Sequence, residues 1–158
     1  MESKMRILIA AVGRAKAGPE RALFGHYQAR LQNPFSLDLK EVEEKRPIQG
    51  AELKHREGSL LLNALPKGIL LVAMDERGKS LSSVDFASKI GNWRDEGVRE
   101  LAFVIGGANG LDDRVRAQAR LVLSFGTQTW PHMLVRGLIA EQIYRAQCIL
   151  GGHPYHRE

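Results

Sequence analysis

Short apolar runs that recur between segments of helical period constrain the fold of this chain more than any other feature. The longest unbroken runs, residues 7–12 and 69–74, have six residues each. A helix that crosses a bilayer needs about 20 apolar residues, so the sequence predicts no membrane segment. Runs of this length fit strands that are buried on both faces of a parallel sheet. The first run lacks the longer apolar region and the cleavage site of a signal peptide, which indicates a first strand.

The order of the expected elements alternates strands with helices along the whole chain. Alternating apolar and polar residues over 35–42 predict a strand with one face in water. Ser82 or Ser83 is expected to cap one helix and Asp112 another. We expect strands over residues 5–12, 35–42, 69–74, 101–105 and 121–125, and helices over residues 19–32, 51–65, 82–96, 112–121 and 131–150. This order predicts an α/β fold, with a mostly parallel sheet and helices on both faces. The chain has no linker or repeat, so we expect one domain over residues 1–158.

The composition is that of a globular protein and limits the chemistry that the chain can carry. Of 158 residues, 44% are hydrophobic and 26% are charged, which argues against a disordered or fibrous chain. The net charge of +5 is compatible with a nucleic-acid partner but is also common in proteins without one. The single cysteine, Cys148, excludes a disulfide within the chain and a cysteine-based zinc site, and it favours a reducing, cytoplasmic location. His153 and His156 lack the spacing and carboxylate partners of a zinc site, so no metal is expected.

Glycine occurs in three loops that follow expected strands, over residues 75–79, 106–110 and 126–131. In parallel α/β sheets, ligands bind beyond the carboxyl ends of the strands, which makes these loops candidates for a binding site. The run Gly106-Gly107-Ala108-Asn109-Gly110 either brings backbone groups against a flat ligand or forms a tight turn between strand and helix. Its glycines do not have the spacing of a dinucleotide-binding loop. Residues 13–18 have the two-glycine spacing of a phosphate-binding loop, but Pro19 and Glu20 replace its lysine and hydroxyl residue.

The last expected helix begins beside the third of these loops and has a broad apolar face. His132 lies in its first turn, where the helix N-terminus disfavours the imidazolium form. The pairs His132/Arg136 and Glu141/Arg145 have the i,i+4 spacing either of ordinary surface pairs or of residues that share a site. The apolar face is wider than one contact with a sheet needs, which indicates either a dimer interface or a large share of the core: Leu134, Val135, Leu138, Ile139, Ile143, Ala146 and Leu150.

The C-terminal tail, residues 151–158, is rich in side chains that suit work on a nucleic acid. Tyr155 can stack on a base, Arg157 can hold a phosphate, and His153 or His156 can transfer a proton. A frayed terminus is the alternative, but such termini are usually rich in Ser, Lys or Glu. The tail is therefore a candidate part of a site.

Together and in this order, these segments closely resemble the ribosomal RNA large subunit methyltransferase H family, a small branch of the SPOUT methyltransferase superfamily. The resemblance is carried by residues 103–111, 123–125, 130–136, 141–146 and 153–158. The match from residue 105 to the C-terminus is the most specific part. The N-terminal strand and residues 74–83 fit the family too, so the resemblance covers essentially the whole chain.

The resemblance implies a parallel α/β sheet whose C-terminal part is threaded into a trefoil knot. It implies S-adenosyl-L-methionine as the methyl donor, bound in a bent conformation in the knot, and a homodimer with composite sites. The implied substrate is a pseudouridine in a stem-loop of large-subunit ribosomal RNA, methylated at N3 on the assembled ribosome.

The resemblance also assigns site residues. Those implied to hold the cofactor are Met74, Gly106, Phe125, Gly126, Thr127, Gln128, Thr129 and Trp130. Those implied to face the RNA and the reaction are His132, Arg136, Arg145, Tyr155, His156 and Arg157. In the expected mechanism, Arg157 or Arg145 lowers the pKa of N3, and His132 or His156 accepts its proton. Ala108, Asn109 and Trp130 depart from the family pattern, which fits a cofactor site made mostly by backbone groups.

Three other functions remain open from the sequence. A SPOUT-type methyltransferase of tRNA would share the knot but not the tail of residues 153–158. A non-catalytic ribosome-binding protein on the same scaffold would not bind S-adenosylmethionine. An oxidoreductase of the dinucleotide-binding class is disfavoured, because no glycine fingerprint follows the first strand.

Overall fold

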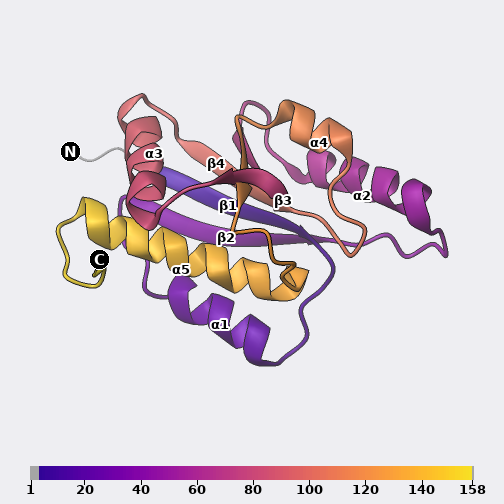
Figure 1. Cartoon of the computed structure of the whole chain (residues 1–158), viewed down its shortest axis with the longest axis horizontal. Helices are drawn as coiled ribbons and strands as arrows, with labels where there is room; N and C mark the ends of the chain where they lie inside the picture. The colour runs from indigo at the N-terminus through magenta and orange to yellow at the C-terminus, as the bar shows by residue number, and fades with distance from the viewer. Residues whose placement is uncertain (1–3, 158) are drawn as a thin grey trace.

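Five parallel strands form the middle layer of the computed structural model, which describes residues 4–157 (Figure 1). The strand order is β2-β1-β4-β3-β5. The strands are β1 (Met5–Val12), β2 (Phe35–Val42), β3 (Leu70–Ser80), β4 (Glu100–Ile105) and β5 (Leu121–Ser124). The helices are α1 (Pro19–Gln28), α2 (Gly50–Ala64), α3 (Ser83–Asp95), α4 (Asp113–Gln118) and α5 (His132–Leu150). The predicted α/β class and its parallel sheet are therefore confirmed.

The apolar runs occupy the centre of the sheet because helices cover both of its faces. β1 lies between β2 and β4, and its residues 9–12 are all buried. At the edge of the sheet, β2 alternates buried Phe35 and Leu37 with exposed Ser36 and Asp38. The prediction that one face of this strand is in water is therefore confirmed.

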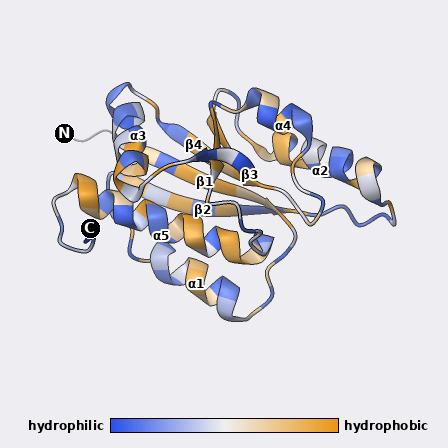
Figure 2. Ribbon diagram, in the orientation of Figure 1, coloured by the Kyte–Doolittle hydropathy of each residue, from blue (hydrophilic) through white to orange (hydrophobic). Residues whose placement is uncertain are grey.

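The helices divide between the two faces of the sheet (Figure 1). α1, α3 and α5 cover one face, and their buried side chains form one core with Ile7 and Phe103. α2 and α4 cover the other face, where Leu61 and Val104 belong to a second core. Figure 2 shows hydrophobic residues along the central strands and a mixture of hydrophobic and hydrophilic residues along the helices.

The broad apolar face of α5 is partly used within the chain. Ile139, Ile143 and Ala146 are buried in the core shared with α1 and α3. Leu134 and Leu138 remain half-buried, so some of this face is left for a contact with another molecule. Among residues 4–157, no helix is long and apolar enough to cross a membrane.

β3 differs from its prediction because it continues beyond Met74. The loop predicted over residues 75–79 is wrong, since these residues belong to the strand. The pairing of β3 with β5 is interrupted after Met74 and resumes at Lys79, and we call residues 75–78 the β3 bulge. Gly78 lets the chain pass close to β5, since a Cβ there would lie 2.6 Å from a carbonyl oxygen of that strand.

Two helices end at least three residues before their predicted bounds of 32 and 121. α1 ends at Gln28, and the chain enters β2 through Pro34, which disfavours helix in the residue before it. α4 ends at Gln118, and two residues later the Arg120 N–H donates to Leu71 O of β3 at 2.8 Å. The sheet therefore limits α4, because Arg120 already bonds to β3.

The contact between α1 and α5 predicts unequal effects at two helical glycines. A Cβ on Gly137 would lie 2.6 Å from Cδ2 of Leu23, whereas a Cβ on Gly25 would have no such neighbour within 4 Å. We expect Gly137→Val to lower the free energy of unfolding by about 1–3 kcal/mol, because it overpacks the contact. Gly25→Val should change it by less than about 0.5 kcal/mol. Urea unfolding followed by circular dichroism measures both, and equal losses would contradict this account.

Candidate functional site

A cavity of about 710 Å³ opens beside the β3 bulge and the carboxyl ends of β4 and β5. Its walls are the β3 bulge, the glycine loop (residues 106–110), the 125–131 loop and the first turn of α5. Small-molecule sites have volumes of about 300–1,000 Å³, so this cavity is large enough for a cofactor. The predicted cofactor residues that line it are Met74, Gly106, Phe125, Gly126, Gln128, Thr129 and Trp130. Thr127 is exposed and does not line the cavity.

The glycine loop presents mainly backbone to the cavity. Gly106 packs so tightly on its own loop that a Cβ would lie 2.6 Å from Gly110 O. The Gly110 N–H donates to Gly107 O at 3.0 Å, and Gly110 has a φ of +83°, which side-chain-bearing residues rarely adopt. Backbone N–H and C=O groups of this wall can therefore approach a flat ligand closely.

Hydrogen bonds to side chains hold the shape of the 125–131 loop. The Gly126 N–H donates to the hydroxyl of buried Ser124 at 3.0 Å, and that hydroxyl lies 2.8 Å from Gly126 O. Trp130 donates from Nε1 to Phe125 O at 3.2 Å. This bond fixes the indole ring, although 40% of the residue is exposed. The loop thus gives the cavity an anchored aromatic surface beside its polar backbone.

His132 lies in the first turn of α5 and lines the cavity. Burial lowers the pKa of His132, and the positive charge of Arg136 lowers it further. The N-terminus of the helix acts in the same direction. At neutral pH the imidazole is therefore uncharged and able to accept a proton.

Arg136 is enclosed, with 1% of its surface accessible. Its guanidinium donates to the carbonyl groups of Val12 and Gly13 at 3.0 and 2.7 Å and to the Glu41 carboxylate at 2.6 Å. Burial raises the pKa of Glu41, but hydrogen bonds from the Ala15 N–H and from Arg136 outweigh this effect and lower it. The prediction that Arg136 faces RNA is wrong, because the guanidinium binds the carboxyl ends of β1 and β2.

The tail folds back on the far end of α5 instead of fraying. Tyr155 donates its hydroxyl proton to Glu141 at 3.2 Å, and Arg145 pairs with the same carboxylate at 2.7 Å. The Arg145 guanidinium lies 4.9 Å from the centre of the Tyr155 ring and 3.0 Å from Nδ1 of His156. Burial raises the pKa of Tyr155, so its phenol stays protonated. Arg157 is exposed.

The predicted site residues therefore form two groups, one at the first turn of α5 and one beside its C-terminal half. His132 belongs to the cavity, whereas Tyr155 and His156 lie with Arg145. Arg145 follows His132 by thirteen residues of one helix, which corresponds to about 20 Å. Within one chain, the tail therefore does not reach the cavity.

A buried carboxylate that the sequence analysis did not single out lies behind the glycine loop. Glu57 of α2 is 8% exposed, and its Oε1 has no hydrogen-bond partner among residues 4–157. Its oxygens would lie 3.1 and 3.2 Å from a Cβ on Gly107, and burial raises its pKa. Its signal in the sequence is its position, one turn before Leu61, which is buried on the same face of α2.

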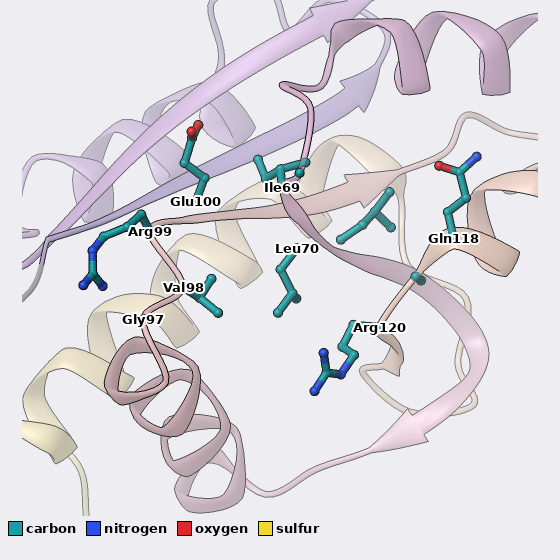
Figure 3. A pocket seen from close by; sticks show the side chains of 11 residues that line it. Ile69, Leu70, Gly97, Val98, Arg99, Glu100, Gln118 and Arg120 are labelled. Carbon is teal, nitrogen blue, oxygen red and sulfur yellow. The ribbon is translucent and has the colours of Figure 1, made fainter.

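A second hollow, of about 620 Å³, lies at the amino ends of β3, β4 and β5 (Figure 3). It is lined by residues 68–71, 97–100 and 118–120, which contain none of the predicted site residues. Because ligands of parallel sheets bind at the carboxyl ends of the strands, the cavity beside the glycine loop is the candidate site. Within residues 4–157, no three His, Cys, Asp or Glu side chains are grouped as metal ligands.

The unpaired carboxylate of Glu57 predicts a pH-dependent gain in stability on neutralising it. The folded-state pKa is raised above its usual value near 4.5, so the folded protein loses stability as the pH rises through this range. Glu57→Gln should therefore raise the free energy of unfolding by about 1–3 kcal/mol at pH 8 and leave it nearly unchanged at pH 4. Exposed Glu52 on the same helix gives the control, Glu52→Gln. Urea unfolding measures the free energy of unfolding of both variants at pH 8 and pH 4. A gain of equal size in Glu57→Gln at pH 4 would disprove this explanation.

Comparison with known proteins assigns the chain to a family. Residues 5–156 match the family model described as "Predicted SPOUT methyltransferase". The chain is 60% identical over 153 residues to Ribosomal RNA large subunit methyltransferase H of Paramagnetospirillum magneticum and 59% identical over 153 residues to that of Rhodospirillum centenum. Each comparison covers 97% of this chain and 99% of the relative.

A solved structure shares the fold at low sequence identity. A probable methylase family protein from Haemophilus influenzae superposes with a TM-score of 0.52 at 9% identity, covering 100% of this chain and 72% of the other. This likeness concerns the fold alone. The match of the family model and the relatives' identity over nearly the whole chain show that it belongs to the ribosomal RNA large subunit methyltransferase H family of SPOUT methyltransferases.

Proposed function

We propose that this protein transfers a methyl group from S-adenosyl-L-methionine to N3 of a pseudouridine in large-subunit ribosomal RNA. The observation that carries the proposal is the cavity beside the β3 bulge and the carboxyl ends of β4 and β5, which is lined by most of the residues that the family motifs assign to the cofactor. Relatives at 60% and 59% identity are named as methyltransferases of large-subunit ribosomal RNA. The family, the lining of the cavity and the names of the relatives all support methyl transfer to ribosomal RNA.

The proposal includes the topology and setting of such an enzyme. We infer a trefoil knot in the chain from β4 to α5, a single domain over residues 1–158 and a cytoplasmic location. The strand order supports the knot, since β3 lies between β4 and β5 although it precedes both in the sequence. The chain that leaves β4 therefore has to pass β3 to reach β5, and the knot would form in this connection.

The residues around the cavity fit S-adenosylmethionine. Adenine is flat, with donors and acceptors on its edge, and the glycine loop offers backbone partners while Phe125 and Trp130 offer apolar ones. Gly106 leaves no room for a side chain, and Gly126 has a φ of +107°. When bound, this cofactor supplies a methyl group on a sulfonium together with the leaving group. The chain therefore needs no nucleophile of its own, and its residues bind and align the two reactants.

The N3 proton must leave during methylation, and we assign its acceptance to His132. This uncharged imidazole lines the cavity, whereas Nδ1 of His156 lies 3.0 Å from Nη1 of Arg145 and already accepts from that guanidinium. Arg145 and Arg157 supply positive charge, which lowers the pKa of a nearby N3. The proton acceptor and the cations therefore have to meet around one base.

A second copy of the chain is needed to bring these groups together. Arg145 lies about 20 Å from His132 along α5, and the tail is packed beside Arg145. In a homodimer, the tail of one copy can complete the cavity of the other. Half-buried Leu134 and Leu138 give α5 apolar surface for that contact. Each active site is then a composite of two chains.

The RNA is presented on the assembled ribosome. A net charge of +5 per chain gives only modest affinity for phosphate independent of sequence. A preformed ribosomal surface compensates for this modest affinity, because it offers a complementary shape and several contacts at once. Binding through phosphates weakens steeply as salt is raised.

Tail substitutions are expected to separate methyl transfer from cofactor binding. Tyr155→Ala removes the ring that packs on Arg145, and Arg157→Ala removes an exposed cation. Each should lower methylation of purified ribosomes by about 100-fold or more, with calorimetric affinity for S-adenosylmethionine changed by about twofold at most. Arg99→Ala is the matched control, because Arg99 directly precedes β4 at the end of the sheet away from the cavity. Full activity in both tail variants would remove the tail from the mechanism, and methylation of tRNA instead of ribosomes would contradict the assigned substrate.

Mixing two inactive variants tests the composite site. Gly106→Trp blocks the cavity and Arg157→Ala disables the tail, so each homodimer should be inactive. After exchange of subunits, half of the dimers are mixed and each has one intact site, which restores about a quarter of wild-type activity. A site built from a single chain would leave the mixture inactive. Sedimentation of each variant confirms that both remain dimers.

A further inference from the structure

One arginine joins two walls of the cavity from behind. Nη1 of Arg116 on α4 donates to Asp75 Oδ2 at 3.0 Å and to Leu111 O at 2.8 Å. Asp75 and Leu111 line the cavity, whereas Arg116 stands outside it. The Asp75 side chain is 8% exposed and that of Arg116 20%. A single nitrogen thus connects the β3 bulge to Leu111, the residue that follows the glycine loop. We call this contact the Asp75–Arg116 bridge.

The β3 bulge needs such a connection because its pairing with β5 is interrupted. Strand pairing stops at Met74 and resumes at Lys79, so residues 75–78 lack a regular ladder with β5. Their other contacts reach the third wall, since Thr129 donates from Oγ1 to the Glu76 carboxylate at 3.2 Å. Besides a bond from the Ser124 hydroxyl of β5 to Glu76 O at 3.1 Å, the bulge is therefore connected to both loops of the cavity.

We propose that Arg116 is a positioning residue for the cofactor, fixing the gap between the β3 bulge and the glycine loop. This inference rests on the proposed function, because the gap is where the adenosine part of S-adenosylmethionine would bind. Backbone groups recognise an adenine edge only when they are held to about 0.5 Å. A loop rich in glycine is flexible by itself, so its position must be set from outside.

The charges of the bridge suit this role. The Arg77 side chain donates to both oxygens of Asp75 at 3.2 and 3.1 Å, the Arg77 N–H donates at 2.9 Å, and Arg116 adds a fourth bond. The hydrogen bond from Arg77 and the charges of both arginines lower the pKa of Asp75, against the opposing effect of burial. The carboxylate therefore stays ionised throughout the neutral range, and its low exposure reduces screening by salt.

Docking of α4 is the competing role for Arg116, and the same helix offers a matched control. Arg114 bonds Asp112 within its own helix start, and it donates to His55 O and Ser59 Oγ of α2 at 2.7 and 3.1 Å. It therefore fastens α4 to α2 without touching the β3 bulge. Removing Arg114 tests the effect of loosening α4, whereas removing Arg116 tests the bridge.

The experiment compares Arg116→Met, Arg116→Lys and Arg114→Met in the full chain. We expect Arg116→Met to weaken calorimetric binding of S-adenosylmethionine about tenfold or more. In the free protein it should speed hydrogen exchange of amides 106–111. Arg116→Lys should recover most of both properties, because its ammonium can stand near the position of Nη1. Arg114→Met should bind as the wild type does, even if its melting temperature falls.

Several results would overturn the proposal. Equal losses of affinity in Arg114→Met and Arg116→Met would mean that α4 is a structural support only. Unchanged affinity in Arg116→Met, or no recovery in Arg116→Lys, would exclude positioning by the bridge. A wild-type protein that binds no S-adenosylmethionine would remove the proposed function and the cofactor role with it. The exchange measurement needs no ligand, so unaltered exchange of amides 106–111 in Arg116→Met would overturn the bridge independently.

Discussion

A buried guanidinium at the carboxyl ends of β1 and β2 holds the candidate site in place. Taking Arg136 out of water is unfavourable, and the Glu41 carboxylate and two carbonyl groups at the end of β1 offset this cost. These bonds determine where α5 begins relative to the sheet, and they thereby place His132 at the cavity. Glycine suits position 13, where the chain leaves β1, because its φ of +97° is one that other residues rarely adopt.

Much of the fold was predictable because burial and capping act locally. The bounds predicted for β1 and β2 agree with the structure, since their apolar patterns end where the strands end. Ser82 caps α3, and its hydroxyl accepts from the Asp85 N–H at 3.0 Å as the sequence suggested. The β3 bulge was missed because its charged residues have little strand propensity. Its conformation depends on Gly78 passing β5 and on Arg116, which are contacts between distant segments.

The candidate site was predictable where it follows from the geometry of a parallel sheet. Loops after neighbouring strands must meet at one edge, and most of the predicted cofactor residues line one cavity there. Arg136, Glu57 and Arg116 show what such reasoning cannot reach. Each is a charged residue on a helix, and helical spacing does not tell a solvent-facing charge from one that is enclosed. The distance between tail and cavity is likewise a property of the folded chain, which the order of motifs along the sequence conceals.

The two tryptophans of this protein lie at opposite extremes of exposure. Trp93 is 6% exposed in the core between helices and sheet, whereas Trp130 is 40% exposed at the mouth of the cavity. Their fluorescence therefore carries separate information, with blue-shifted emission from a dry core and red-shifted emission from a wet rim. A molecule that fills the cavity would contact Trp130 and leave Trp93 untouched, so the red edge of the emission is expected to respond to binding and the blue edge to unfolding.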